Sequence, residues 1–212
     1  MTRLVLASTS PARLALLRAG GIEPTTISPG VDEDEVAARA TEMGLINSTA
    51  DMVHILAKAK AEAVLDHPDA AGAIIVGCDS SLEFDGKSMG KPHDPEVARA
   101  RWQAMRGRAG TLFSGHWVID NRKPVSGQLS PATGRVSSSI VHFADITDAE
   151  IDAYVATGEP LKVAGAFTID GMGGAFLRSI EGDAHTVIGL SLPTLRDLVI
   201  GLGVEYPSLW NK

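Results

Sequence analysis

The chain has 212 residues, of which 44% are hydrophobic and 21% charged, and its formal net charge is −7. These values are typical of a soluble globular protein with one large domain or two small lobes, and the acidic balance argues against a broad basic face for duplex DNA or RNA. Cys78 is the only cysteine, which excludes an internal disulfide and any multi-cysteine metal site. The longest apolar run, AAGAIIVGC, is too short for a membrane helix. We therefore expect a cytoplasmic protein that binds neither nucleic acid nor membrane.

The N-terminal segment predicts a short strand over residues 3–8 and an amphipathic helix over residues 10–21. Ser10 is a good N-cap, and Pro11 suits the first helical position because its missing N–H has no partner there. A strand, a tight turn and a helix N-terminus also form a common site for anions. The segment therefore has both a structural and a functional interpretation.

The first half of the chain continues with alternating elements. Residues 25–40 predict a strand-like stretch, a Pro-Gly turn, an acidic cluster and the start of a helix, and residues 51–67 predict a full helix. Residues 72–92 predict a buried strand that breaks at Asp79, followed by a small hairpin that turns at Asp85-Gly86.

The second half follows the same alternation. Three helices are expected, over residues 94–110, 147–158 and 191–203, and Thr147 and Glu150 have the spacing of a capping box. Strands are expected over residues 111–120 and 134–146, with a polar connection between them, and residues 165–183 look Gly-rich and strand-like. Interleaved helices and strands without a repeat or linker predict a single α/β domain over residues 1–212 with a mixed sheet.

Asp79 is the first candidate for chemistry, because it directly follows the apolar run AIIVGC. Ligands gather at the carboxyl ends of strands in open α/β sheets. A carboxylate followed by Ser80 and Ser81 can hold a hard cation such as Mg²⁺ through oxygen ligands. The plain alternative is a helix or turn cap.

An acidic cluster and several cations strengthen the first interpretation. Acidic residues 32–35 suit a helix N-terminus, but at least one of them can turn inward as a second metal ligand. Four cations accompany the carboxylates, with two lysines expected on one face of the helix over residues 51–67: Arg13, Lys58, Lys60 and Lys91. Each alone is typical of a solvated surface, whereas carboxylates and cations together indicate metal-assisted phosphoryl chemistry.

Other catalytic motifs are absent or weak. The chain lacks G-x-x-x-x-G-K-[ST] and G-x-S-x-G, and its GMGG run lacks the spacing of a dinucleotide fingerprint. The six histidines show no metal-ligand spacing. Trp102 lies on an amphipathic helix, where we expect it to pack in the core.

Five stretches resemble, in order, the Maf proteins, a family of nucleoside triphosphate pyrophosphatases also called septum formation inhibitors. They run from Arg3 to about Gly203: LASTSPARLALLRAGG, VDEDE, AKAKAEAV, VGCDSSLEFDGKSMGKPHDPEVA and ITDAEIDAYVATGEPLKVAGAFTIDGMGGAFLRSIEGDAHTVIGLSL. The resemblance implies a mixed twisted sheet with flanking helices, as in Maf and ITPase-like proteins, with two lobes around a central cleft. It also implies a divalent cation, Mg²⁺ or Mn²⁺, a nucleoside triphosphate substrate and a homodimer.

The resemblance also assigns residues. Substrate-binding positions are Ser8, Ser10 and Arg13 of the S-x-S-P-R-R motif, with Ser80 and Asp170. The catalytic positions are Asp79 of the G-A-D-T motif, the loop carboxylate Glu33, the helix lysine Lys60 and the K-P lysine Lys91. Asp79 and Glu33 would also hold the metal.

Three positions depart from the family pattern. Ala12 replaces the first arginine of S-x-S-P-R-R, so one expected cation is missing. Asp170 stands where many members have the glutamine of GIQG, where an acid can bind metal, accept a proton or read the base differently. Val163 replaces the common lysine before AGA, with Lys162 one position earlier.

The resulting hypothesis is hydrolysis of a nucleoside triphosphate to the monophosphate and pyrophosphate. A nucleotide-binding regulator of cell division with weak or no turnover is the first alternative, favoured by Ala12 and Asp170. A phosphatase or kinase-like enzyme that acts on the terminal phosphate is the second, and it would release inorganic phosphate instead of pyrophosphate.

Overall fold

A computed structural model describes residues 1–123 and 129–211 of the protein. The chain folds into two compact units. The first comprises Met1–Asp79, Ser114–Ser137 and Gly189–Lys212, and the second comprises Ser80–Phe113 and Ser138–Ile188. The two units agree with the two lobes that the sequence implies, whereas the cleft between the lobes stays a prediction.

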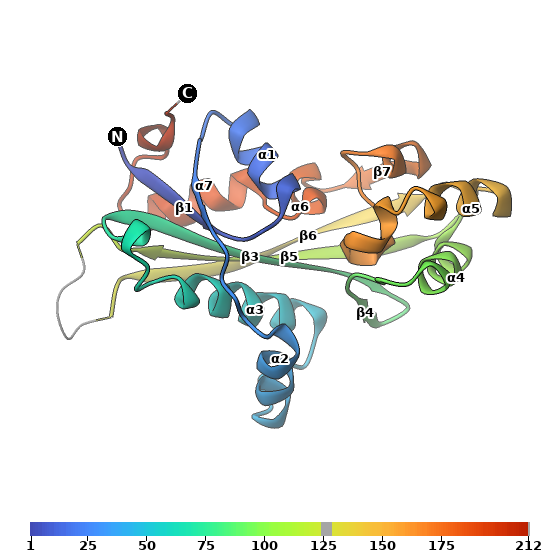
Figure 1. Cartoon of the computed structure of the whole chain (residues 1–212), viewed down its shortest axis with the longest axis horizontal. Helices are drawn as coiled ribbons and strands as arrows, with labels where there is room; N and C mark the ends of the chain where they lie inside the picture. Colours follow the sequence, from blue (N-terminus) through green and yellow to red (C-terminus); the bar gives the residue numbers. More distant parts are fainter. Residues whose placement is uncertain (124–128, 212) are drawn as a thin grey trace. The chain divides into compact units, whose positions relative to one another are not determined.

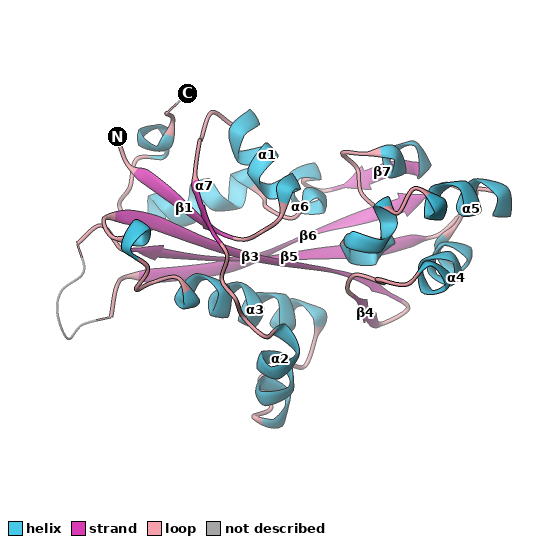
Figure 2. Ribbon diagram, in the orientation of Figure 1, coloured by secondary structure: helices cyan, strands magenta, loops and turns pink. Residues whose placement is uncertain are grey.

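Among the described residues, seven strands form one mixed sheet in the order β2-β1-β3-β5-β6-β7, with β4 paired to β3. Strand β1 is parallel to β2 and β3, whereas the β3–β4 and β6–β7 pairs are antiparallel. Figure 2 shows these strands in magenta: β1 (Arg3–Ala7), β2 (Thr25–Ile27), β3 (Ala73–Phe84), β4 (Lys87–Met89), β5 (Ala109–Asp120), β6 (Ala132–Phe143) and β7 (Leu177–Glu181). The predicted α/β class with a mixed sheet is confirmed.

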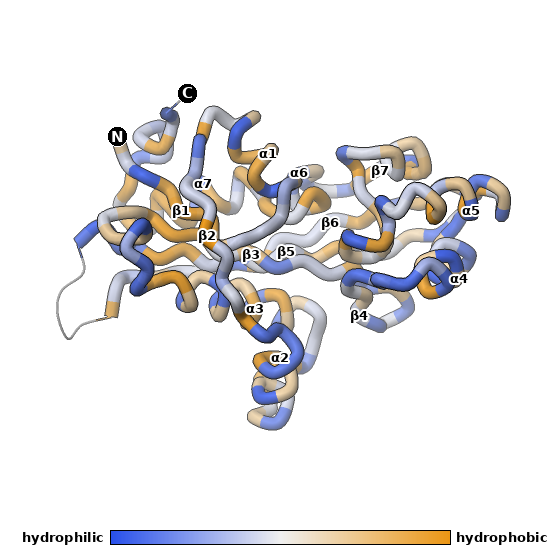
Figure 3. Tube along the Cα trace, in the orientation of Figure 1, coloured by the Kyte–Doolittle hydropathy of each residue, from blue (hydrophilic) through white to orange (hydrophobic). Residues whose placement is uncertain are grey.

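Each helix of the first unit begins directly after an N-cap residue. These helices are α1 (Pro11–Ala19), α2 (Glu33–Glu42), α3 (Thr49–Ala63) and α7 (Leu192–Gly201), and short 3₁₀ turns follow α3 at Pro68–Ala70 and α7 at Tyr206–Leu209. Each helix follows a Ser or Asp whose side chain accepts a hydrogen bond from the backbone N–H three residues later. The apolar strand β1, orange over most of its length in Figure 3, is buried from Leu4 to Ala7.

The second unit contains α4 (Pro95–Met105), α5 (Asp148–Ala156) and α6 (Ala184–Ile188), with 3₁₀ turns at Glu159–Lys162, Ala164–Ala166 and Met172–Phe176. Helices α4 and α5 lie side by side (Figure 1). Trp102 of α4 is fully buried, and its ring meets those of Phe143, Tyr154 and Phe176 edge to face. The expected packing role of Trp102 is confirmed, as is the capping box of Thr147 and Glu150.

The predicted strand break at Asp79 is wrong. Strand β3 does not break at Asp79 but continues to Phe84, because Leu82 and Phe84 are buried beyond the polar residues and pair with β4. The predicted hairpin turn at Asp85-Gly86 is confirmed, with positive φ at both residues.

The Gly-rich segment over residues 165–183 is strand only at Leu177–Glu181. Its earlier part forms 3₁₀ turns, because the chain bends around neighbouring side chains instead of pairing with a strand. A Cβ on Gly171 would lie 2.5 Å from a carboxylate oxygen of Glu159, and one on Gly173 would lie 2.4 Å from the Tyr154 hydroxyl. Helix α6 and the 3₁₀ turns were not predicted from the sequence.

Helix α3 lies against the sheet at two glycines that leave room for its backbone. A Cβ on Gly77 of β3 would lie 2.3 Å from the Ala57 carbonyl oxygen, and a Cβ on Gly115 of β5 would lie 2.2 Å from the Val53 carbonyl oxygen. No side chain fits at either position without moving the helix. The backbone of α3 therefore rests directly on the sheet.

No helix among the described residues is long and apolar enough to span a membrane.

We expect Gly77→Ala to destabilise the protein by about 2 kcal/mol or more, because the added methyl group must push α3 away from β3. The midpoint of thermal unfolding should fall by roughly 4–8 °C for a chain of this length. Gly201→Ala is the matched control, since nothing lies within 4 Å of a Cβ at that helical position. Equal unfolding midpoints for the two variants would contradict the close contact.

Candidate active site

Asp79 lies in the part of β3 that extends beyond the end of the neighbouring strand β1. The last pair between β1 and β3 joins Ala7 to Gly77, and β1 ends there, whereas β3 continues. Because alternate residues of a strand point to the same face, Asp79 shares the face of Gly77, on which α3 rests. Asp79 therefore stands just beyond the carboxyl end of β1, with α3 beside it.

Lys60 of α3 connects two carboxylates. Its Nζ lies 2.6 Å from Oδ1 of Asp79 and 2.8 Å from Oε1 of Glu33. The Lys60 and Asp79 side chains are only 8% and 10% exposed, whereas that of Glu33, at the start of α2, is 50% exposed. One ammonium group thus serves a buried and a half-exposed carboxylate. Glu33 of the acidic cluster therefore contacts the buried Lys60, whereas its role as a second metal ligand stays a prediction.

Burial raises the pKa of the Asp79 carboxyl above its ordinary value, although the positive charges of Lys60 and Arg13 act to lower it. The negative charge of Glu33 adds to the increase. Loss of hydration disfavours the charged form of a carboxyl group more than the nearby cations favour it here. A carboxylate with a raised pKa accepts a proton more readily near neutral pH, which suits a general base.

The N-terminus of α1 is tied to the strand beside Asp79. Arg13 Nη1 donates to the carbonyl oxygen of Cys78 at 2.9 Å and to Oγ of Ser8 at 3.3 Å, and its Nε donates to the carbonyl oxygen of Gly189 at 2.8 Å. Ser8 Oγ also accepts from the N–H of Ser10 at 3.1 Å, and Ser10 caps the helix as predicted. The three predicted residues of this motif therefore form one connected group.

The two lysines of α3 do not share a face, contrary to the expectation from the sequence. Positions two apart on a helix point in nearly opposite directions. Lys58 is about half exposed; its Nζ lies 5.2 Å from the Trp117 ring centroid and 3.9 Å from Oε1 of Glu62. Lys60 is buried, so the interpretation as a solvated surface charge holds for Lys58 and is wrong for Lys60.

The remaining predicted residues belong to the second unit. Ser80 follows Asp79 in β3 and is half-buried, and Lys91 is exposed in the segment between β4 and α4. Asp170 is exposed, and its carboxylate accepts a hydrogen bond from the Thr168 hydroxyl. Their participation in one site with Asp79 stays a prediction.

Sequence reasoning missed how the segment after Asp170 is held. Glu159 accepts hydrogen bonds from the N–H groups of Met172 and Gly173 at 3.0 and 2.9 Å, and from the Tyr154 hydroxyl at 2.8 Å. Burial acts to raise the pKa of Glu159, but these three donors outweigh it and the pKa is lowered. The only signal in the sequence is an acidic residue after a helix-ending glycine, which is too common to single out.

The carboxylates fit a hard divalent cation, although they do not enclose one. Over residues 1–123 and 129–211, no group of three or more His, Cys, Asp or Glu side chains is arranged to hold a metal ion. Asp79 and Glu33 supply oxygen donors that reach a common cation, the Nζ of Lys60. Mg²⁺ is usually held by one or two protein carboxylates, with substrate phosphates and water as its other ligands. The donor set therefore suits a cation that is bound together with a phosphate.

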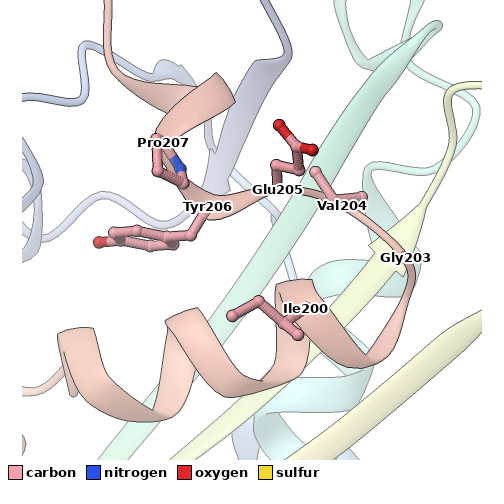
Figure 4. Close-up of a pocket in the computed structure, with 6 residues that line it drawn as sticks. All are labelled: Ile200, Gly203, Val204, Glu205, Tyr206 and Pro207. Atoms are coloured by element: carbon pink, nitrogen blue, oxygen red, sulfur yellow. The ribbon is translucent and has the colours of Figure 1, made fainter.

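An open pocket of about 460 Å³ lies elsewhere in the first unit. Figure 4 shows its lining, in which Ile200 of α7 faces the segment that contains Tyr206 and Pro207. None of the predicted site residues lines this pocket. Its lining is mostly apolar, so we assign it no role in phosphate or metal binding.

Comparisons with known proteins agree over nearly the full length. A family model described as Maf-like protein matches residues 3–202. The chain is 56% identical to a nucleoside triphosphate pyrophosphatase of Leifsonia xyli subsp. xyli, over 99% of this chain and 97% of that protein. It is 50% identical to a protein of the same name from Streptomyces avermitilis, over 99% and 95%. Among solved structures, the Staphylococcus aureus Ham1 protein matches with a TM-score of 0.41 and 12% identity, over 93% of this chain and 91% of that one.

Cys78, the residue before Asp79, provides a chemical test of burial at the site. Burial raises the pKa of its thiol to about 11, and the thiolate is the reactive form. At about pH 8, we expect the native protein to react with a disulfide reagent at least about 100-fold more slowly than the urea-unfolded protein. The signal is unambiguous because the chain has one cysteine. Similar rates for native and unfolded protein would contradict the burial of β3.

Proposed function

The chain belongs to the family of Maf-like proteins, and we propose that it hydrolyses nucleoside triphosphates to the monophosphate and pyrophosphate. Relatives that carry the name nucleoside triphosphate pyrophosphatase, at 50–56% identity, support the proposal. The single observation in the structure that carries it is the buried Lys60, placed between Asp79 and Glu33.

The polar groups of this site suit a triphosphate. The N-terminus of a helix attracts anions through its free N–H groups and its dipole, and α1 begins at Pro11, next to Ser8 and Ser10. Arg13 holds this turn against β3 through Ser8 and the Cys78 carbonyl. We assign phosphate binding to this turn, and to Lys60 once the substrate offers it phosphate oxygens. Lys91 and Ser80 are proposed to complete the set.

Asp79 is the proposed general base. Its raised pKa lets the carboxylate accept a proton from a water molecule as the water oxygen bonds to the α-phosphorus. The bond from that phosphorus to the bridging oxygen then breaks, and pyrophosphate leaves with the bonding electron pair. Lys60 and Arg13 stabilise the negative charge that builds up on the phosphate oxygens.

The family fits a metal-dependent reaction, and we propose Mg²⁺ or Mn²⁺ with Asp79 and Glu33 as its protein ligands. When bound, such a cation neutralises charge on the triphosphate and polarises the phosphorus–oxygen bonds. Asp79 can act as base or as ligand, and both roles need its carboxylate at the place where Lys60 now meets it.

Several finer points remain predictions. Asp170 is proposed to contribute to recognition of the nucleobase of the substrate, because it replaces the usual glutamine of the family and is exposed to solvent. The cytoplasmic location, the homodimer, and the lack of nucleic-acid or membrane partners are likewise expected from the sequence and the resemblance.

We expect Asp79→Asn to reduce turnover by about 10²–10⁴-fold, because the amide cannot accept a proton from water. Products are measured over a panel of normal and modified triphosphates, with Mg²⁺, with Mn²⁺ and with chelator. Lys58→Gln is the matched control, since Lys58 is half-exposed on the same helix and should leave turnover unchanged. Circular dichroism verifies that both variants fold.

Each other outcome of this assay has a meaning. Unchanged turnover in Asp79→Asn would overturn its role as base. Inorganic phosphate in place of pyrophosphate would show attack at the terminal phosphate. Nucleotide binding without any metal-dependent product would favour a nucleotide-sensing regulator of cell division.

A further inference from the structure

We propose that Lys60 is the resident counter-ion of the Asp79–Glu33 pair and that a divalent cation enters the site only as Lys60 leaves Asp79. The ammonium lies 2.6 Å from Asp79 Oδ1 and 2.8 Å from Glu33 Oε1, which are the distances of charge-assisted hydrogen bonds. It therefore occupies the place between the two carboxylates that a metal ion would need. The inference rests on the proposed function and adds the control of metal binding to it.

The charges of the site explain why a divalent cation gains little binding free energy there when no nucleotide is present. Two carboxylates face the ammonium of Lys60, and Nη1 of Arg13 donates to the carbonyl oxygen of Cys78, the residue before Asp79, at 2.9 Å. Two negative and two positive charges nearly cancel. A divalent cation that approaches this set is repelled by the two cations about as strongly as it is attracted by the two carboxylates. Removal of one positive charge ends that balance.

A triphosphate changes the balance by giving Lys60 another partner. The lysine stem is flexible and ends in a compact charge with three donors, so the ammonium can move from Asp79 to phosphate oxygens without unfolding α3. Both carboxylates are then free for the metal. The described residues offer no third His, Cys, Asp or Glu ligand beside this pair, so phosphate oxygens and water would supply other ligands of a bound metal. Metal and nucleotide therefore favour each other's binding, and without nucleotide the site binds the metal only weakly.

The test measures Mn²⁺ affinity by water-proton relaxation in the full chain without any nucleotide. We expect Lys60→Gln and Lys60→Met to bind Mn²⁺ about tenfold or more tightly than the wild type, because they remove the competing charge. Lys60→Arg keeps that charge and should stay within about threefold of the wild type. Lys58→Gln removes a charge two residues away on the other side of α3 and should also leave the affinity unchanged.

Equal or weaker Mn²⁺ binding by the neutral Lys60 variants would overturn the inference, and so would an equal gain in Lys58→Gln. If the neutral variants do not fold, lysine acetylation of the wild-type protein tests the inference instead. Mn²⁺ bound at high concentration must then increase the acetylation rate of Lys60, with Lys58 as the internal reference, and bound Mn²⁺ with an unchanged rate overturns the inference. No readout uses turnover, so failure here leaves the proposed hydrolysis standing, and the absence of hydrolysis leaves these affinities meaningful.

Discussion

The contact of α3 with the sheet at Gly77 and Gly115 is the constraint on which the site depends. Where a side chain is absent from β3, the helix backbone comes to rest on the strand backbone. Lys60 lies one position before Ala61, which packs on Gly77, and Asp79 lies two residues beyond Gly77 on the same face. The close approach thus excludes water from both side chains and brings Nζ to Oδ1. With a larger residue at position 77, the two charges would be separated or hydrated.

Burial of the charged Lys60 and Asp79 side chains has an electrostatic cost that other interactions in the fold must offset. A single charge buried without a partner costs several kcal/mol, and removal of one partner from a buried pair is strongly destabilising. Here Lys60 and Asp79 neutralise each other, while the half-exposed Glu33 supplies a further acceptor for the ammonium. The same loss of hydration raises the pKa of Asp79. Burial that is unfavourable for stability therefore creates the basicity that a general base requires, which is a common feature of functional sites.

The sequence predicted what is decided locally. Caps such as Ser10 and Thr147 mark helix starts because a side-chain oxygen bonds to an N–H three residues away, and the turn at Asp85-Gly86 follows from its two residues. Features that depend on distant segments were not predicted. Asp79 looked like a strand end because its neighbours in sequence are polar, whereas pairing with β4 carries the strand onward. Lys60 looked solvated because nothing nearby in the sequence shows that Gly77 brings its helix onto β3.

A double-mutant cycle between Lys60 and Asp79 tests the central claim most directly. Unfolding free energies in urea would be measured for the wild type, Lys60→Gln, Asp79→Asn and the double variant. Because each single change leaves a buried group without its charged partner, we predict that the double variant loses less stability than the sum of the single changes, by about 1 kcal/mol or more. Effects that add to within about 0.5 kcal/mol would show that the two side chains do not interact. That result would contradict the site from which the function is argued.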